Sequence, residues 1–489
     1  MTTEELIAAR RAEPWREALR KSKKNKERTD IPRVEMNELD AEYRSHTRLE
    51  EVNLGLTKEQ AMQEAQRCLD CPNPTCMQGC PVSINIPTFV KNIERGEFLE
   101  AARVLKETSV LPAVCGRVCP QEKQCESKCI HLKMGKPAVA IGYLERFAAD
   151  YERESGNISI PEVAEKNGIK IAVVGSGPAG LSFAGDMAKR GYDVTVFEAL
   201  HEIGGVLKYG IPEFRLPNKI VDVEIEGLRK MGVKFMTNCI VGKTISYDDL
   251  HADGFKGIFA ASGAGLPNFM NIPGENLVGV MSSNEYLTRV NLMDAANPDS
   301  DTPVLQGKKV AVIGGGNTAM DSVRTARRLG AERAMIVYRR SEEEMPARLE
   351  EVKHAKEDGV EFMTLHNPVE YLGDERGRVK QMRLQKMELG EPDASGRRRP
   401  VPVEGAIETI DVDEVIVSVG VSPNPLIPRA FQGLEVSKKG TIVVNEENMR
   451  SALPDVYAGG DIVRGGATVI LAMGDGRKAA AAMDEALRG

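Results

Sequence analysis

The 489-residue chain has no long apolar run and no excess of positive charge. Without a stretch of about 18 apolar residues, no membrane-spanning helix is predicted. The N-terminal residues lack the apolar centre of a signal peptide, so we expect a cytoplasmic protein. A net charge of -7 lacks the basic balance typical of nucleic-acid binding. We therefore expect neither a membrane nor a nucleic acid among its partners.

Basic residues are concentrated in one short run, residues 20–28 (RKSKKNKER). Such runs usually lie in water, and we expect a solvated N-terminal arm. Cysteine is nearly absent after residue 129, where only Cys239 remains. We expect this residue to be a small buried hydrophobe in or beside a strand. Flavoprotein disulfide reductases keep a cysteine pair beside the flavin, and this stretch of the chain has no such pair.

Eight of the nine cysteines lie in two groups before residue 130: Cys68, Cys71, Cys76 and Cys80, then Cys115, Cys119, Cys125 and Cys129. Structural zinc sites favour two C-x2-C pairs or histidine ligands, but the sequence has one such pair and six histidines. Ferredoxin-like runs gather three cysteines around one cluster and use a fourth, followed by proline, for another. The spacing therefore favours two [4Fe–4S] clusters, with zinc and disulfides as the alternatives.

A glycine-rich turn, G-x-G-x-x-G, follows the apolar run at residues 171–174 and precedes a helical pattern. Its residues are Gly175, Gly177, Ala179 and Gly180. Glycines allow a pyrophosphate to approach the backbone, and the helix start offers free N–H groups. Glu198 ends the next predicted strand, where a carboxylate accepts hydrogen bonds from ribose hydroxyls. This pattern predicts a dinucleotide site.

A second turn of the same kind comprises Gly314, Gly316, Asn317, Thr318 and Ala319. Here the following strand ends in arginines instead of an acid, namely Arg339 and Arg340. Two guanidinium groups suit a 2′-phosphate, which a carboxylate would repel. We therefore expect NADP(H) at this turn.

The C-terminal stretch from residue 452 resembles the second FAD motif of flavoproteins with two dinucleotide-binding domains. The resemblance implies that Asp461 contacts the ribitol chain and that Ala467, Thr468 and Val469 lie near the isoalloxazine ring. Gly205, in HEIGG, fits the same family. The first turn would then bind FAD, and the FAD domain would be interrupted by the NADP(H) domain.

The expected fold class is α/β, with an all-helical iron–sulfur domain followed by two Rossmann-like domains. The expected segments are a helical domain at 1–155, a linker at 156–168, an FAD-binding segment at 169–300, the NADP(H) domain at 301–424 and a closing FAD-binding segment at 425–489. Residues 390–405 are expected to form an exposed hairpin tip or loop.

The order of these motifs resembles the glutamate synthase small (beta) subunit family. That family also includes the large subunit of NADH-dependent ferredoxin:NADP oxidoreductase and the homotetrameric-type glutamate synthase proteins. The motifs include RCLDCPNPTCMQGCPV, VCGRVCPQEKQCESKC, KYGIPEFRLP and YRRSEEEMPAR. The resemblance implies one cluster on Cys68, Cys71, Cys76 and Cys129, and another on Cys80, Cys119, Cys125 and Glu145. Counting cysteines alone would instead make Cys115 a ligand.

The resemblance implies an oxidoreductase that moves electrons between NADP(H), FAD and two [4Fe–4S] clusters, to or from a partner subunit. One branch supplies an NADPH-dependent glutamate synthase, and the other couples NADH, NADP and ferredoxin by electron bifurcation. Hydride transfer belongs to the cofactors, so no catalytic side chain is expected. The alternatives are a stand-alone NADPH-dependent flavin reductase and a zinc-stabilised dinucleotide-binding adaptor.

Overall fold

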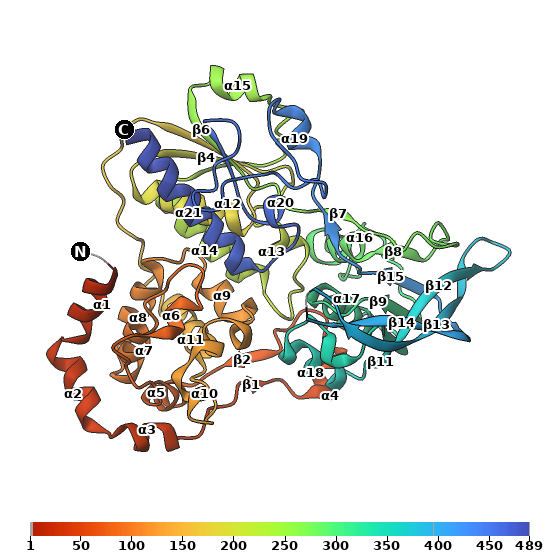
Figure 1. Cartoon of the computed structure of the whole chain (residues 1–489), viewed down its shortest axis with the longest axis horizontal. Helices are drawn as coiled ribbons and strands as arrows, with labels where there is room; N and C mark the ends of the chain where they lie inside the picture. The colour runs from red at the N-terminus through yellow and green to blue at the C-terminus, as the bar shows by residue number, and fades with distance from the viewer. Residues whose placement is uncertain (1–2, 395, 489) are drawn as a thin grey trace.

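The computed structural model describes residues 3–394 and 396–488 and comprises three units (Figure 1). A helical N-terminal unit lies beside two α/β units, each built on its own parallel sheet. The predicted α/β architecture with a helical N-terminal domain is therefore confirmed. Among the described residues, no helix is long and apolar enough to cross a membrane.

The N-terminal unit consists of short helices joined by the cysteine-bearing loops. Its elements are α1 (Thr3–Arg11), α2 (Pro14–Ser22), α3 (Asn25–Asp30), β1 (Asn37–Glu38), α4 (Ala41–His46), β2 (Asn53–Gly55), α5 (Lys58–Gln66), α6 (Thr75–Gln78), α7 (Ile86–Glu94), α8 (Phe98–Lys106), α9 (Pro112–Val118), α10 (Ile130–Lys133) and α11 (Ile141–Ser155). Short 3₁₀ turns cover Gln121–Lys123 and Glu126–Lys128. Thr57 and Gln60 form the capping box that starts α5.

The basic run at 20–28 is not simply a solvated arm. Arg28 is 1% exposed and donates to Glu94, while Arg20 donates to Asp70. Most residues between them are exposed, including Lys21, Lys24 and Lys26, and for these the prediction holds. The two arginines depart from the expected solvated arm because a charged side chain can leave water where a partner carboxylate neutralises it.

The first α/β unit has a five-stranded parallel sheet in the order β17-β6-β3-β4-β5. Its elements are β3 (Lys170–Val174), α12 (Pro178–Lys189), β4 (Asp193–Phe197), α13 (Val206–Tyr209), α14 (Asn218–Lys230), β5 (Lys234–Met236), α15 (Tyr247–Ala252), β6 (Phe255–Ala260), α19 (Leu426–Ala430), β17 (Val456–Ala458), α20 (Asp461–Arg464) and α21 (Val469–Arg488). Because β17 pairs with β6 across almost two hundred intervening residues, this unit is split along the chain.

The second α/β unit is inserted between β6 and β17 and has the strand order β11-β10-β9-β15-β8. Its elements are β8 (Val280–Ser282), α16 (Ser283–Leu287), a π-helical turn (Thr288–Leu292), β9 (Lys309–Ile313), α17 (Asn317–Arg328), β10 (Arg333–Tyr338), a 3₁₀ turn (Glu342–Glu344), α18 (Leu349–Glu357), β11 (Glu361–Thr364) and β15 (Glu414–Val417). Since β8 already belongs to this sheet, the second unit begins before the expected boundary at residue 301.

Two antiparallel features complete the second unit. A three-stranded sheet joins β12 (His366–Gly373), β13 (Val379–Pro392) and β14 (Arg398–Asp411). The last two form a long ribbon that projects from the molecule (Figure 1). Its turn lies between Pro392 and Arg398, so residues 390–405 hold the predicted hairpin tip together with the strand ends that flank it. A two-stranded crossing pairs β7 (Leu266–Pro267) with β16 (Val421–Ser422), where the chain leaves and re-enters the first unit.

Candidate functional site

A cavity of about 1350 Å³ lies where the three units meet. Its walls include the first glycine turn, the second glycine turn and the C-terminal tail. Val118 and Pro120, on either side of Cys119, also line it. Four motifs that are far apart in the sequence therefore face one space, which is large enough for extended ligands.

The first glycine turn connects β3 to α12. Gly175 has φ of +99°, and a Cβ on it would lie 2.5 Å from the carbonyl oxygen of Ala261. A Cβ on Gly180 would lie 2.0 Å from the carbonyl oxygen of Gly175. Only glycine fits both positions, which keeps the turn tight and aims the start of α12 at the cavity.

Glu198 lies at the end of β4 and is buried against the glycine turn. Its Oε2 accepts hydrogen bonds from Ser176 N (2.9 Å) and Ser176 Oγ (2.6 Å), and its Oε1 accepts one from Leu200 N (2.9 Å). These donors hold the carboxylate at the cavity wall. Gly205 lies across the same turn, and a Cβ on it would be 3.0 Å from the Cα of Gly177.

The C-terminal tail lines the same cavity beside the first glycine turn, since a Cβ on Gly460 would lie 3.0 Å from the Cβ of Ala179. Asp461 accepts a hydrogen bond from Ala467 N at 2.9 Å, which folds the loop before α21 back on itself. Burial raises the pKa of Asp461 above its ordinary value. Ala467, Thr468 and Val469 line the cavity, and α21 starts at Val469 with its N-terminus there.

The second glycine turn connects β9 to α17. Gly314 has φ of +143°, and a Cβ on it would lie 2.3 Å from the carbonyl oxygen of Ser418. Gly316, Asn317 and Thr318 line the cavity, while Ala319 is buried in the core beneath the helix start. The turn is therefore formed as the sequence predicts.

The two arginines after β10 differ in environment. Arg339 is exposed. Arg340 is 7% exposed, and it donates to Asp393 Oδ2 (2.6 Å) and to the carbonyl oxygen of Arg398 (2.8 Å) on the ribbon. The guanidinium of Arg340 therefore already binds the tip of the ribbon, which leaves Arg339 as the more accessible of the two charges.

The cysteines gather in two groups that mix both sequence stretches. In the first group, the side chains lie close enough for their charges to interact, and its members are Cys68, Cys71, Cys76 and Cys129. Burial, followed by the charges of these three neighbours, raises the pKa of Cys76 well above its ordinary value. Burial also raises the pKa of Cys68 to about 11. Thiols gathered in this way need a metal centre to hold them as thiolates.

The other group brings Cys80, Cys119 and Cys125 to Glu145 of α11. Burial, with smaller contributions from the charges of Glu145 and Cys119, raises the pKa of Cys80 to about 12. Glu145 is 5% exposed, and burial raises its pKa to about 8. Its Oε1 is buried without a hydrogen-bond partner. A buried carboxylate oxygen without a partner, set among thiols, is a donor set that suits a metal centre.

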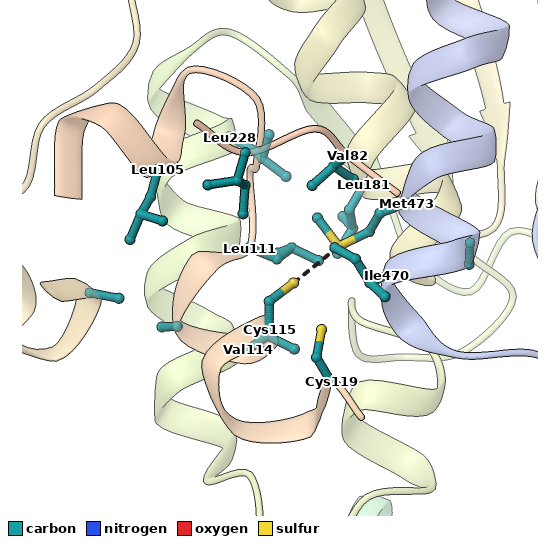
Figure 2. Close-up of a cluster of buried hydrophobic side chains, with 14 of the residues drawn as sticks. Val82, Leu105, Leu111, Val114, Cys115, Cys119, Leu181, Leu228, Ile470 and Met473 are labelled. Atoms are coloured by element: carbon teal, nitrogen blue, oxygen red, sulfur yellow. Dashed lines mark hydrogen bonds between the residues drawn. The ribbon is translucent and has the colours of Figure 1, made fainter. Parts of the chain in front are cut away.

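Cys115 lies beside this second group but points into the core. Figure 2 shows it among Leu111, Val114 and Ile470, with its thiol directed at Met473 of α21. The Sγ–Sδ distance is 3.5 Å, and Cys115 is fully buried. The pKa of Cys115 is raised well above its ordinary value, first by a hydrogen bond to the Cys119 side chain and then by burial. It therefore behaves as a neutral thiol in an apolar setting.

Among the residues that the structure describes, no cysteine belongs to a set of three ligand atoms within 4.8 Å of one another, as one zinc ion would require. One zinc ion with four thiolates holds its sulfurs about 3.8 Å apart. Across residues 3–394 and 396–488, the only three ligand atoms of histidine, cysteine or acid found within 4.8 Å of one another belong to Glu38, His354 and Glu357. Arg44 forms ion pairs with both carboxylates of that set, Glu38 and Glu357. An iron–sulfur cluster spreads its ligands more widely, because each binds a different iron.

Residues next to the second cysteine group contact the C-terminal tail. Gln124 Nε2 donates to Thr468 Oγ1 at 3.4 Å. A Cβ on Gly474 of α21 would lie 3.0 Å from the carbonyl oxygen of Pro81, so the helix and the loop after Cys80 are in close contact. The second group therefore lies against the wall of the cavity, next to the tail.

Residues to which the sequence pattern assigns no role also shape this site. Arg215 lines the cavity and donates from Nη1 to both carboxylate oxygens of Asp321 at 2.8 Å. In the sequence, its motif KYGIPEFRLP is only a family signature. This charge pair cannot be inferred from the motif, because the partner lies on a different domain.

Arg348 is a second residue of this kind. Its N–H donates to Asn317 Oδ1 at 2.9 Å, beside the second glycine turn. Its guanidinium donates to the carbonyl oxygen of Arg117 (2.7 Å) and to Gln121 Oε1 (3.1 Å). Arg348 thereby joins the second turn to the loop around Cys119.

Cys239 is only partly buried and lines the cavity near Glu198, so the prediction of a simply buried residue is incomplete. Its N–H donates to the carbonyl oxygen of Glu198 at 2.9 Å. This backbone contact, formed just after β5 ends, places Cys239 at the cavity wall. The sequence pattern around residue 239 does not reveal the contact.

Two family models match the chain. Residues 44–157 match dihydropyrimidine dehydrogenase domain II with a 4Fe-4S cluster, and residues 169–486 match the pyridine nucleotide-disulphide oxidoreductases. The glutamate synthase (NADPH) small chain of Escherichia coli K12 is 37% identical over 428 residues, which cover 86% of this chain and 90% of that protein.

Other relatives belong to different enzymes. The NADP(+)-dependent formate dehydrogenase subunit beta of Moorella thermoacetica is 38% identical over 84% of this chain and 60% of its own length. The solved structure of Mycobacterium tuberculosis FprA in complex with NADPH aligns with a TM-score of 0.55 at 21% identity. It covers 66% of this chain and 85% of that chain, and it shows a shared fold.

Proposed function

Because this chain belongs to the glutamate synthase small-chain family, we propose that it is the NADP(H)-reactive subunit of a multi-subunit oxidoreductase. It exchanges electrons with a partner subunit through FAD and two [4Fe–4S] clusters. The relatives are named as small chains or beta subunits of several enzymes, which supports a partner subunit. The observation that carries the proposal is the division of the cysteines into two groups, with the second against the cavity wall.

The donors present fit the expected groups. The first glycine turn, Glu198 and Asp461 suit FAD, since they offer a helix N-terminus for the pyrophosphate and carboxylates for the hydroxyl groups. The remaining FAD contacts are proposed at Gly205 and at the start of α21. When bound, FAD takes up a hydride and releases electrons singly, and the clusters carry single electrons.

The second glycine turn suits NADP(H), with the pyrophosphate at the start of α17. Arg339 and Arg340 remain the proposed partners of the 2′-phosphate, and the exposure of Arg339 favours it as the principal contact. Both turns face one cavity, so the chain's own residues orient two dinucleotides toward each other and limit the water between them.

For the clusters, we propose one on Cys68, Cys71, Cys76 and Cys129 and another on Cys80, Cys119, Cys125 and Glu145. The unpartnered Oε1 of Glu145 supports the carboxylate ligand. Every cysteine of the first group is only partly buried, whereas Cys119 and Cys125 of the second are buried. The first group is therefore the proposed end toward the partner, and the second is the end toward the flavin.

Anaerobic purification of the whole chain tests this function. We expect about eight irons and one FAD per chain, and NADPH should reduce both the flavin and the clusters. A preparation that contains zinc and no iron would refute the proposal in favour of a zinc-stabilised adaptor.

A second experiment separates the electron relay from a plain flavin reductase. Cys68→Ala and Cys80→Ala should abolish electron transfer to a protein partner, while Cys239→Ala, outside both groups, should retain it. Full transfer in the first two variants would support a flavin reductase whose clusters are not involved.

A further inference from the structure

Residues 3–30 form an arm of three helices that the proposed function leaves without a role. Helices α1, α2 and α3 run along the outer side of the helical domain (Figure 1). The family model for that domain begins only at residue 44. The arm is therefore an addition to the matched domain, and its contacts decide what it does.

Three arginines of the arm converge on Asp70. Arg16 Nη2 lies 2.5 Å from Asp70 Oδ1, and Arg20 Nη1 lies 2.7 Å from Asp70 Oδ2. Arg11 Nε donates to the carbonyl oxygen of Asp70 at 2.8 Å. Asp70 is fully buried and stands between Cys68 and Cys71, with a left-handed φ of 52°.

This left-handed conformation turns the chain sharply between two cysteines of one group. Few non-glycine residues adopt this conformation, and although aspartate does so more readily than most, contacts around it are needed to hold it in one geometry. Here the enforcing contacts are the carboxylate and carbonyl bonds to the arm. The arm thus fixes the path of the loop from Cys68 to Cys71.

A second contact fixes the other side of the same loop. Arg28, the last arginine of the arm, pairs with Glu94 at 2.9 Å and donates to the carbonyl oxygen of Gln66 at 2.6 Å. Glu94 also pairs with Lys91, whose Nζ donates to the carbonyl oxygen of Cys68 at 2.6 Å. Both ends of the segment from 66 to 70 are therefore held through arginines of the arm.

The charges of the arm also matter to the thiols. Two guanidinium groups face the single carboxylate of Asp70, which leaves an excess of positive charge beside the first group. The charge of Arg11 lowers the pKa of Cys71, although burial, the largest effect, raises it. Positive charge favours thiolates and favours the more negative, reduced state of a cluster.

We propose that the arm is a positioning element for the first cysteine group, in which Arg16 and Arg20 act through Asp70. They hold the loop of Cys68 and Cys71 in its binding shape and supply charge that favours the bound cluster. The inference rests on the proposed function, because it assumes that this group holds a cluster. A purely structural arm would contribute to stability without affecting iron retention or cluster potential.

The test compares two variants of the full-length chain with equal loss of charge. Arg16→Met with Arg20→Met removes both guanidinium contacts to the Asp70 carboxylate and leaves the bond from Arg11 to the Asp70 carbonyl oxygen in place. Lys21→Met with Lys26→Met removes two exposed charges from the same arm. Both are reconstituted anaerobically, and iron, FAD and the potential of each cluster are measured by chemical analysis and by redox titration followed by electron paramagnetic resonance.

We expect the arginine variant to keep its FAD and lose about half of its iron, as the first group empties. If iron is retained, its first cluster should have a more negative potential. The lysine variant should match the wild type. Full iron with an unchanged potential in the arginine variant would overturn the proposal.

Arg16 is 1% exposed, so its replacement could unfold the arm. Arg20→Met alone avoids this, because the side chain is 19% exposed and leaves Arg16 paired. It should shift the potential in the same direction by a smaller amount, and no shift would count against the role of charge. A wild-type chain without iron would instead refute the proposed function, so the two failures are distinguishable.

Discussion

The thiol of Cys115 lies 3.5 Å from the thioether of Met473 and is directed at it from within the apolar core (Figure 2). Glu145, in contrast, has a buried carboxylate oxygen without a hydrogen-bond partner. The two residues therefore have opposite relationships to the same site, and they give opposite expectations when replaced.

Replacement of Cys115 should leave the iron content unchanged. Cys115→Ser conserves the size and the donor, so we expect about eight irons per chain as in the wild type. Glu145→Ala should lose or convert the second cluster, with a lower iron content or an altered paramagnetic signal. Iron analysis of both variants, with FAD content as a check on folding, decides between them. Loss of iron in the Cys115 variant alone would make Cys115 the ligand.

Arg215→Ala should destabilise the chain by about 3–5 kcal/mol, because it removes the paired charge of the buried Asp321 and leaves the buried Glu351 with Arg324 alone. Arg215 pairs with both across the boundary between the two α/β units. Differential scanning calorimetry measures the effect. Arg333→Ala is the control, since its pair with Glu361 is exposed and should contribute less than about 1 kcal/mol. Equal midpoints would show that the buried pair adds no stability.

Gly180→Ala should abolish FAD binding while the N-terminal domain retains its iron. The added Cβ would lie 2.0 Å from the carbonyl oxygen of Gly175, and backbone cannot move aside cheaply. The flavin absorption of the purified protein reports the loss. Gly227→Ala, in α14 with no atom within 4 Å of its added Cβ, should keep the flavin and gain about 0.5–1 kcal/mol of stability. A fully flavinated Gly180 variant would contradict the prediction.

Arg339→Ala should weaken binding of NADP⁺ selectively. A hydrogen bond to a charged group is worth about 1.5–3 kcal/mol, which corresponds to a roughly 10- to 150-fold loss of affinity. Affinity for NAD⁺ should stay the same, because it lacks the 2′-phosphate. Calorimetric titration with both nucleotides measures the ratio, and Arg399→Ala on the exposed ribbon is the charge-matched control. Equal losses for both nucleotides would assign Arg339 a structural role.

The buried carboxyl group of Glu414 should make the free energy of unfolding depend on pH. Its Oε2 accepts from Gly307 N at 2.9 Å, its Oε1 is buried without a partner, and burial raises its pKa to about 7. The folded state therefore binds this proton more tightly than the unfolded state does. Stability contributed by the protonated group is lost as pH rises from about 4.5 to about 7.

Glu414→Gln stays neutral at every pH, so it should be more stable than the wild type at pH 8 by roughly 1–3 kcal/mol. At pH 4 the two should unfold at nearly the same temperature. Glu404→Gln, at an exposed position, should show no such difference. A stability gain that is constant from pH 4 to pH 8 would exclude titration of Glu414 as its cause.

The elements nearest to each motif could be predicted from the sequence because their causes are local. The capping box at Thr57 and Gln60, the glycine turn at Gly175 and the strand that ends at Glu198 depend on neighbouring residues. The basic run and the length of the ribbon were less predictable. Arg28 is buried by a carboxylate from α7, and the length of the ribbon depends on the pairing of β13 with β14 on either side of the predicted hairpin tip.

The sequence by itself determined the chemistry available to this protein: eight clustered cysteines, two dinucleotide turns and an acid or arginines after their strands. The tertiary structure alone decided how these residues combine. It joins Cys76 to Cys129, turns Cys115 toward Met473, exposes Arg339 while burying Arg340, and folds the arm onto Asp70. Side-chain identity and spacing are encoded locally, whereas burial and charge pairing depend on contacts between segments that are far apart in the chain.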